Sequence, residues 1–409
     1  MVGGIIKQYN VEWERRDGIT VIKEGMNSSG KSFGVYIHVP FCRSKCLYCD
    51  FYSIPSARPD AIERYVSALC KHIEYMGTAA KGRTVDSIFM GGGTPTVLNV
   101  EQFGRIASSI EKSFFVASDC EFTVEANPST FDTDKISALR SMGVNRMSIG
   151  MQSANAEELR LLGRTHRAEE VKMAVDAVNR GGIGNFNLDL MYGIPSQTVE
   201  SFGHTLEFVK GLEPTHISVY GLQLEEGTPL YRRRDKYVFP DEDEEKAMNR
   251  LAAEILGADG YNRYEISNYA REGYECRHNL RYWLREDYLG SGAAAHSFFC
   301  GERYFSPDDI EEYVSAVNGG NWEKLALDRQ SIDSEEAVEE YIMLRMRLAS
   351  GVSPAEFIAD TGRDFAPYEE LMQPFLRSGH IRFSNGRYSF TPEGFDVSNY
   401  ILANILACG

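Results

Sequence analysis

The chain has 409 residues, more than one compact domain of ordinary size, so a large domain with a smaller one is expected. Its hydrophobic content of 43% and charged content of 25% are typical of a soluble globular protein, and no apolar run approaches the ~18 residues of a transmembrane helix. With no such run and no apolar segment behind a basic start, we expect a cytoplasmic protein with at most peripheral membrane contact. A formal net charge of −16 repels phosphate backbones, so we expect no nucleic-acid partner.

Short β-rich segments alternate with segments of helical period over the first two thirds of the chain. The first intervening helix is expected to begin with Asp60 as its cap. Such alternation predicts a parallel sheet with helices outside it, and the even spacing favours a partial (β/α)6 barrel, an α/β fold. The predicted strands are residues 35–39, 85–90, 121–126, 145–150, 186–191 and 216–221.

Three cysteines lie close together in the stretch HVPFCRSKCLYCDFYS, directly after the first predicted strand: Cys42, Cys46 and Cys49. Zinc normally takes four ligands, and a zinc site would have to recruit His38 or Cys276. An iron-sulfur cluster held by three cysteines leaves one iron free for a small ligand. Such an iron can take the amino and carboxylate groups of S-adenosylmethionine, which a reduced cluster splits to a carbon radical.

Other chemically distinctive residues also follow predicted strands. GGGTPT (91–96) comes after the second strand, Glu125 and Asn127 end the third, Gln152 follows the fourth, and Asp189 ends the fifth. Because the carboxyl ends of parallel strands converge on one face of a barrel, these separate motifs are expected to form one site.

The pattern of the C-terminal residues predicts a separate structural unit. Asp333 caps a helix, two shorter helical stretches follow, and Asn385-Gly386 between two short strands indicates a hairpin. This order is typical of an α+β winged-helix-like domain, but residues 334–409 contain six arginines, no lysine and eleven acidic residues, which argues against DNA binding. The predicted division is an N-terminal extension (1–33), the barrel (34–260), a connecting region (261–332) and the C-terminal domain (333–409).

Taken in order, the motifs resemble a known family. The segments YIHVPFCRSKCLYCDF, GGGTPT, EANPST, GVNRMSIGMQS, LGRTH and NLDLMYGIP resemble the oxygen-independent coproporphyrinogen III oxidase (HemN-like) group of the radical S-adenosylmethionine superfamily. The resemblance runs from residue 35 to about residue 400 and implies a radical S-adenosylmethionine barrel with the C-terminal domain of this group.

The resemblance also implies roles for single residues. The three cysteines match the ligands of a 4Fe-4S cluster. Tyr36 matches a tyrosine near S-adenosylmethionine, and the backbone of Gly92, Gly93 and Thr94 would approach its amino-acid end. Polar contacts to the same cofactor would come from Glu125, Gln152, Arg164 and Asp189. No catalytic residue is assigned.

Two further features resemble one branch of this group, the HemW-type heme chaperones. The oxidases carry a fourth cysteine two residues after the third, where this chain has Phe51. The stretch 261–298 resembles the branch's HNxxYW segment, which implies heme binding by His278, Tyr282 and Trp283, with His296 as an alternative ligand. The expected function is therefore heme delivery to a recipient hemoprotein, with an electron donor for the cluster. The alternatives are a coproporphyrinogen oxidase or another porphyrin-modifying radical enzyme, and a barrel that holds structural zinc.

Overall fold

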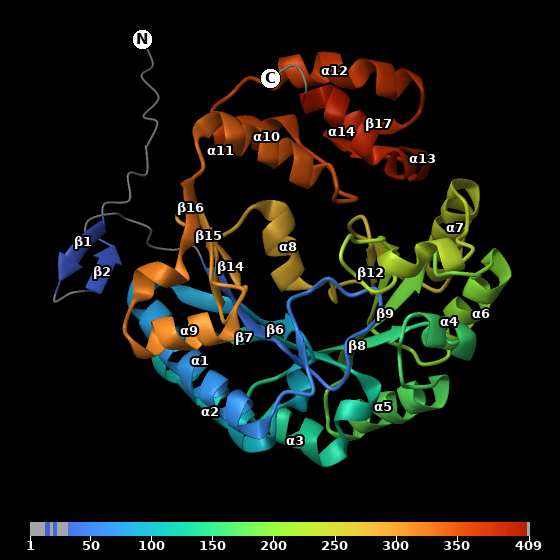
Figure 1. Ribbon diagram of the computed structural model, residues 1–409. Coiled ribbons are helices and arrows are strands. Elements are labelled where there is room, and N and C mark those ends of the chain that lie inside the picture. Colours follow the sequence, from blue (N-terminus) through green and yellow to red (C-terminus); the bar gives the residue numbers. More distant parts are fainter. Residues whose placement is uncertain (1–12, 17–18, 23–31, 407–409) are drawn as a thin grey trace, which may run out of the picture.

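The computed structural model describes residues 13–16, 19–22 and 32–406. Most of the predicted N-terminal extension lies outside the described residues. Its described part is a short antiparallel hairpin of β1 (Trp13–Arg16) and β2 (Ile19–Ile22), at the left of Figure 1.

The six predicted strands are confirmed, and they are neighbours in one parallel array in the sequence order of the chain. The strands are β3 (Phe33–Val39), β6 (Thr84–Gly92), β7 (Phe115–Ala126), β8 (Arg146–Gln152), β9 (Asn185–Tyr192) and β10 (His216–Gly221). Each connection between them crosses over through a helix, which is the arrangement of a (β/α)6 barrel. The predicted fold class is therefore confirmed.

Additional strands extend both edges of this array into a 12-stranded mixed sheet. One edge carries β12 (Asn268–Ala270) and β11 (Asn262–Arg263), and the other carries β13 (Tyr288–Ser291), β14 (His296–Phe299), β15 (Glu302–Phe305) and β16 (Leu327–Ser331). The sheet therefore stays open instead of closing on itself. All six added strands come from the predicted connecting region, which shares the sheet of the barrel.

Helices cover the outer side of the curved sheet (Figure 1). They are α1 (Pro59–Ala79), α2 (Val100–Ser113), α3 (Thr133–Ser141), α4 (Ala156–Leu161), α5 (Ala168–Arg180), α6 (Val199–Lys210), α7 (Glu242–Ala258) and α9 (Ile310–Asn318). The first helix begins earlier than predicted, because Pro59 takes the first helical position, for which its fixed φ is suited. Asp60 then lies in the first turn instead of at the cap.

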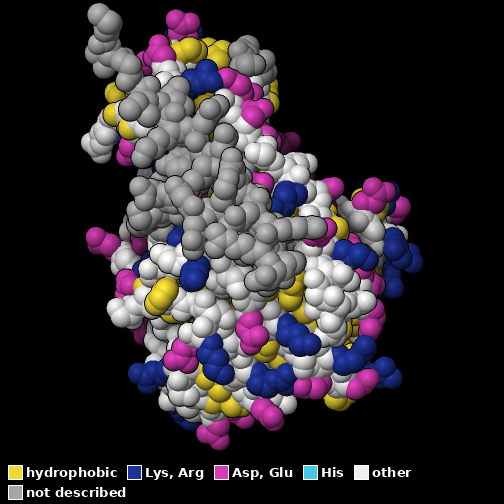
Figure 2. All heavy atoms as spheres, turned by 90° about the vertical axis from the view of Figure 1, so that its left-hand side faces the viewer, with side chains coloured by type: hydrophobic (Ala, Val, Ile, Leu, Met, Phe, Trp, Pro, Cys, Tyr) yellow, Lys and Arg dark blue, Asp and Glu magenta, His cyan; other side chains and the backbone are white. Residues whose placement is uncertain are grey.

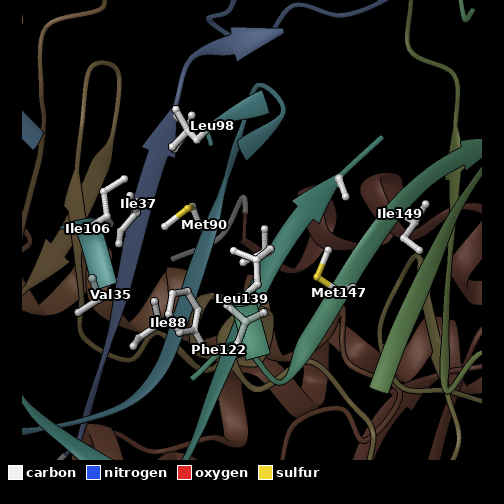
Figure 3. Close-up of a cluster of buried hydrophobic side chains, with 14 of the residues drawn as sticks. Val35, Ile37, Ile88, Met90, Leu98, Ile106, Phe122, Leu139, Met147 and Ile149 are labelled. Carbon is white, nitrogen blue, oxygen red and sulfur yellow. The ribbon is translucent and has the colours of Figure 1, made fainter. Parts of the chain in front are cut away.

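The core depends on the alternation of side chains along the parallel strands. Successive residues of a strand point to opposite faces of the sheet, so every second residue shares a face. One face is apolar and packs with helix residues in a single cluster, part of which is drawn in Figure 3. The labelled strand residues there are Val35, Ile37, Ile88, Met90, Phe122, Met147 and Ile149, and they meet Ile106 of α2 and Leu139 of α3.

The other face of the same strands is polar and lines the inside of the curved sheet. Strand register places these residues side by side: Ser148 is opposite Asn187, and Asn187 is opposite His216. Asp189 is likewise opposite Ser218. A further helix, α8 (Arg277–Leu284), packs against this polar face. The candidate site therefore lies in the concave side of the sheet.

The C-terminal part has its own hydrophobic core of residues between Val338 and Ile405. It contains α10 (Ser334–Arg345), α11 (Pro354–Thr361), α12 (Ala366–Arg377), β17 (Ile381–Ser384), β18 (Arg387–Phe390), α13 (Pro392–Asp396) and α14 (Ser398–Leu406). The order of three helices followed by a hairpin is confirmed, with Asp333 as the cap of α10 and Asn385-Gly386 in the left-handed turn. The last two helices were not predicted.

Ion pairs attach the C-terminal unit to the barrel. Glu340 of α10 accepts hydrogen bonds from Arg285 Nε at 2.7 Å and Arg303 Nη2 at 2.8 Å, while its own side chain is 11% exposed. Asp396 pairs with Arg250 of α7 at 2.7 Å, and the Asp396 side chain is 4% exposed. The first contact joins α10 to the end of α8, so the unit lies beside that helix, as Figure 1 shows.

On the face in Figure 2, the Lys and Arg side chains are interspersed with Asp and Glu side chains wherever grey atoms do not cover it. No helix among the described residues is long and apolar enough to cross a membrane.

The paired arginines make Glu340 a test of this attachment. Burial alone would raise the pKa of Glu340, but the bonds from Arg285 and Arg303 hold it below its ordinary value. We expect Glu340→Ala to lower the free energy of unfolding by about 1–3 kcal/mol near neutral pH, because both arginines lose their acceptor. The wild-type advantage should shrink as the pH falls through the pKa of Glu340. Urea unfolding checks this, with exposed Glu339→Ala as control; equal effects of the two substitutions would contradict it.

Candidate functional site

The cysteine loop lies at the carboxyl end of β3, with residues 43–45 and 50–51 exposed and the three cysteines partly covered. It begins with β4 (Phe41–Cys42), which pairs with β5 (Ile54–Pro55) at the far end of the loop. Two backbone hydrogen bonds hold its middle: Leu47 N–H donates to Leu162 O, and Leu230 N–H donates to Leu47 O. All three cysteines are half-buried. The loop is therefore closed at its base and anchored to two other segments.

A chain of hydrogen bonds connects two of the three cysteines through side chains from other loops. Arg164 donates from Nη1 to Cys46 Sγ at 3.3 Å and from Nη2 to Asn127 Oδ1 at 2.5 Å. Asn127 Nδ2 donates to Thr94 Oγ1 at 3.0 Å, and Thr94 Oγ1 donates to Cys42 Sγ at 3.5 Å. Arg164 and Thr94 were predicted as site residues, and Asn127 is the link that places them together.

The thiols of Cys42 and Cys49 hold their protons more strongly than exposed cysteines do. Burial raises the pKa of Cys42, although the hydrogen bond from Thr94 opposes the shift. Burial also raises the pKa of Cys49 to about 11. A metal centre bound as thiolates must therefore displace these protons, which makes its binding depend on pH.

The arrangement does not suit a single zinc ion. Among residues 32–406, no three His, Cys, Asp or Glu side chains are placed to hold one metal ion together. His38 is hydrogen-bonded at both ring nitrogens, to Tyr36 OH and Tyr52 O. Cys276, the cap of α8, donates from Sγ to Glu121 of β7. A 4Fe-4S cluster differs, because each cysteine binds a different iron and the sulfurs need not converge on one point.

The glycine-rich strand end is shaped by close approaches within the protein. Gly92 has φ +101°, and a Cβ there would lie 2.3 Å from the His38 ring. The N–H groups of Gly92, Gly93 and Thr94 already donate to Glu125, Val39 O and Phe41 O. A ligand at this edge would therefore not receive hydrogen bonds from these three N–H groups unless it displaced their present partners.

Two carboxyl groups, Glu125 of β7 and Asp189 of β9, face the same interior. Burial, with a smaller contribution from Asp189, raises the pKa of Glu125 to about 8. Burial also raises the pKa of Asp189, against hydrogen bonds from Asn187 and Ser218. Two carboxyls whose burial disfavours their charged forms favour a cationic ligand, which would allow both to ionise.

The remaining predicted cofactor residues lie beside these groups. Gln152 ends β8 with φ +69° and is 7% exposed. A Cβ on Gly150 would lie 2.9 Å from Arg164 Nη2 and 3.0 Å from Gln152 Nε2, so only glycine allows both side chains to approach. Tyr36 OH bonds to Nδ1 of His38 at 3.0 Å, which fixes the tyrosine in the interior. The structure thus brings together all predicted cluster and cofactor residues.

His278 is placed differently from a free metal ligand. It is fully buried, with Nδ1 bonded to Ser87 Oγ at 3.0 Å and Nε2 bonded to Tyr282 OH at 2.9 Å. Its ring stacks on Phe89, and burial followed by Arg281 lowers its pKa to about 3. Trp283 is half-buried. In this structure His278 presents no unbonded nitrogen, so the prediction that it ligates heme requires these bonds to break.

His296, the alternative ligand, is exposed on β14. Its ring stacks on Phe305 at 5.1 Å, and burial of part of the ring and Arg303 lower its pKa. It is close enough to His38 to contribute to the lowered pKa of that residue. It therefore lies near the interior that holds the other site residues.

The comparisons with known proteins agree with this geometry. Residues 36–209 match the Radical SAM superfamily and residues 332–397 match the HemN C-terminal domain. The heme chaperone HemW of Bacillus subtilis is 33% identical over 379 residues, covering 91% of this chain and 98% of the relative. The Escherichia coli HemW is 36% identical over 375 residues, covering 91% of this chain and 98% of the relative.

The chain belongs to the HemW family. A solved structure of coproporphyrinogen III oxidase (HemN) from Escherichia coli superposes with a TM-score of 0.80 at 24% identity, over 92% of this chain and 89% of that chain. This likeness shows that the two proteins share a fold. A radical S-adenosylmethionine domain implies a 4Fe-4S cluster and S-adenosylmethionine, and the cysteine loop and the interior carboxyls fit both groups.

Sequence reasoning missed a set of polar residues deeper in the interior, three of them buried and Tyr264 half-buried. They are Ser148, Asn187, His216 and Tyr264, all in contact through hydrogen bonds. The signal that could have found the first three is the two-residue alternation along the predicted strands, which places them on the same face as Asp189.

Asn127 gives a test of the hydrogen-bond chain between the cysteines. We expect Asn127→Ala to make reconstituted iron about tenfold easier to remove with a chelator, since loss of an outer-shell partner typically weakens metal binding by that order. The measurement is the rate of iron loss under anaerobic conditions. Asn145→Ala is the control. The Asn145 side chain, just before β8, bonds to Cys120 O and Phe122 N of β7, away from the carboxyl ends of the strands. Unchanged iron retention in Asn127→Ala would contradict the proposed link.

Glu125 gives a test of the interior electrostatics in the protein without cofactors. Its pKa is raised from 4.5 to about 8, so the folded state holds a proton that the unfolded state releases between these values. Over that window this group makes the folded state less stable as the pH rises, by at most ~1.4 kcal/mol per pH unit. We expect Glu125→Gln to flatten the decline in unfolding free energy, measured with urea at a series of pH values. Parallel pH curves of the two proteins would rule this out.

Proposed function

We propose that this protein is a heme chaperone that binds heme and delivers it to a hemoprotein in the cytoplasm. The observation that carries the proposal is the match, over 91% of this chain and 98% of the relative, to a curated heme chaperone. Phe51 supports this branch over the oxidases. It is 66% exposed and replaces a cysteine of their motif, so it adds no ligand to the loop.

We assign the cluster to Cys42, Cys46 and Cys49. These three thiolates would hold the cluster, which would supply the one-electron chemistry that cleaves S-adenosylmethionine. In this assignment Glu125 and Asp189 favour the cationic cofactor, and Arg164, which already touches Cys46, orients its carboxylate. We assign the remaining contacts to this cofactor to Tyr36, Gly92, Gly93, Thr94 and Gln152.

Cluster reduction needs an electron donor, and we propose that it docks on the exposed edge of the cysteine loop. Arg43 and Lys45 are exposed there, and Lys45 Nζ donates to Phe51 O at 3.1 Å. This edge offers two positive charges beside an exposed aromatic ring. An acidic donor protein with an apolar contact would match it.

For heme, the geometry favours His296 as the ligand of the protein in this conformation. His296 is exposed, whereas His278 would first have to give up Ser87 and Tyr282. Tyr282 packs edge-on against Tyr288, which pairs with Phe298 of β14, two residues beyond His296. Strand register therefore places aromatic residues between α8 and the exposed histidine, and an aromatic ring in this region could pack on a porphyrin face.

The function is tested with anaerobically reconstituted protein. We expect heme to bind with a shifted Soret band, and no protoporphyrinogen to form from coproporphyrinogen in the presence of S-adenosylmethionine and a reductant. His296→Ala should weaken heme binding at least tenfold, because losing an iron ligand costs more than a neutral hydrogen bond of ~1 kcal/mol. Cys42→Ala should remove the cluster and leave heme binding measurable.

His278→Ala separates the two candidate ligands. If only this substitution weakens heme binding, α8 opens to expose its histidine and His296 is not the ligand. Steady decarboxylation of coproporphyrinogen by the wild type would instead overturn the chaperone function and favour an oxidase.

A further inference from the structure

A continuous chain of hydrogen bonds, with buried Asn187 and His216 at its centre, joins the Asp189 carboxylate to the start of helix α8. Asn187 Nδ2 donates to Asp189 Oδ1 at 2.7 Å, and Asn187 Oδ1 bonds to His216 Nδ1 at 2.7 Å. His216 Nε2 bonds to Tyr264 OH at 2.9 Å, and the N–H of Cys276, the cap of α8, donates to Tyr264 OH at 3.3 Å. Four contacts thus connect a predicted cofactor ligand with the helix of the HNxxYW segment.

The donors in this chain all point the same way. Asp189 accepts the Asn187 amide N–H, which leaves the amide oxygen of Asn187 as an acceptor for His216 Nδ1–H. Burial and nearby Arg146 lower the pKa of His216 well below its ordinary value, so its ring is neutral. Nε2 of that neutral ring must then accept from Tyr264 OH, whose oxygen accepts from Cys276 N–H. Bonds aligned head to tail polarise one another toward the carboxylate.

The fold holds the links of this chain in place. Asn187 and His216 are partners in the register of β9 and β10, and they are 2% and 1% exposed. Ser148 fixes the same amide from the other side by accepting from Asn187 Nδ2 at 2.7 Å. Because Asn187 and His216 are desolvated, bulk water cannot readily replace a partner that either of them loses.

The start of α8 is tied to the barrel by a second acceptor. Glu121 of β7 accepts from the N–H groups of Arg277 and His278, both at 3.1 Å, and from Cys276 Sγ at 3.5 Å. A carboxylate at a helix N-terminus satisfies free N–H groups and interacts favourably with the helix dipole. The first turn of α8 is therefore fixed by Glu121 and Tyr264 together.

We propose that His216 and Tyr264 are positioning residues that orient the Asp189 carboxylate for S-adenosylmethionine and couple it to the start of helix α8. The proposal rests on the assignment of Asp189 to the cofactor made above. Its consequence is that a change at Tyr264, which touches no predicted cofactor residue directly, weakens cofactor binding through His216 and Asn187.

Tyr264→Phe tests the proposal, because it removes the hydroxyl and keeps the ring. The protein is the anaerobically reconstituted full chain, and the measurement is the dissociation constant of S-adenosylmethionine by equilibrium dialysis. Electron paramagnetic resonance of the reduced cluster serves as a second readout. We expect binding to weaken roughly three- to tenfold, the effect of losing one typical hydrogen bond. Iron content should stay at the wild-type level.

Tyr261→Phe is the matched control. Tyr261 is 1% exposed and its hydroxyl donates to Pro214 O at 2.6 Å, outside the chain of contacts to Asp189. Unchanged cofactor affinity in this variant, with weaker affinity in Tyr264→Phe, supports the proposal. Equal weakening in both variants overturns it, since the loss would then come from general softening of the barrel.

Asp189→Asn separates this proposal from the assignment on which it rests. If Asp189→Asn weakens cofactor binding and Tyr264→Phe does not, the positioning role is overturned while the cofactor site stands. If Asp189→Asn binds like the wild type, Asp189 is not a cofactor ligand and the positioning role falls with it. Should Tyr264→Phe fail to fold, His216→Gln replaces it, because one amide cannot reach both Asn187 and Tyr264, and the same outcomes apply.

Discussion

The structure depends on the separation of apolar and polar side chains between the two faces of one parallel sheet. Val35, Ile37, Met147 and Ile149 bury one face against helices, and hydrophobic burial on this scale is the main favourable term in folding. The other face carries polar groups. Most parallel sheets have helices on both faces, so that both faces of their strands are apolar. Here the curvature of the sheet encloses that face, so the polar groups bond with one another in a desolvated interior.

Desolvation explains the chemistry of this interior. The carboxyls of Glu125 and Asp189 are both harder to ionise than in water, and burial is the larger cause for each. Arg164 provides positive charge beside Cys46 at the rim. An interior with costly negative charge is suited to a ligand that brings a cation, and the sulfonium of S-adenosylmethionine is such a group.

Helix α8 connects the parts of the molecule. It packs on the interior face through His278 and Arg281, which both contact Ser87, and its first turn is held by Glu121. Arg285 follows it and binds Glu340 of the C-terminal unit. The segment that resembles a heme-binding motif is therefore in contact with the cofactor barrel on one side and the C-terminal unit on the other.

The sequence by itself determined the barrel strands, the C-terminal order of helices and hairpin, and the set of residues near the predicted cluster. These features are local: strand period, turn chemistry and the position of a residue at a strand end are written in neighbouring residues. The cysteine and glycine motifs are also short and contiguous, so their family resemblance indicated the cofactors from the sequence.

Only the tertiary structure decided which side chains are joined by hydrogen bonds. Asn127 links two cysteine contacts because three loops meet at one edge, and His216 reaches Asn187 because strand register makes them opposite. It also decided that His278 is buried with both nitrogens bonded while His296 is exposed. Burial and partnership depend on residues far apart in the chain, and a motif of neighbouring residues carries no information about them.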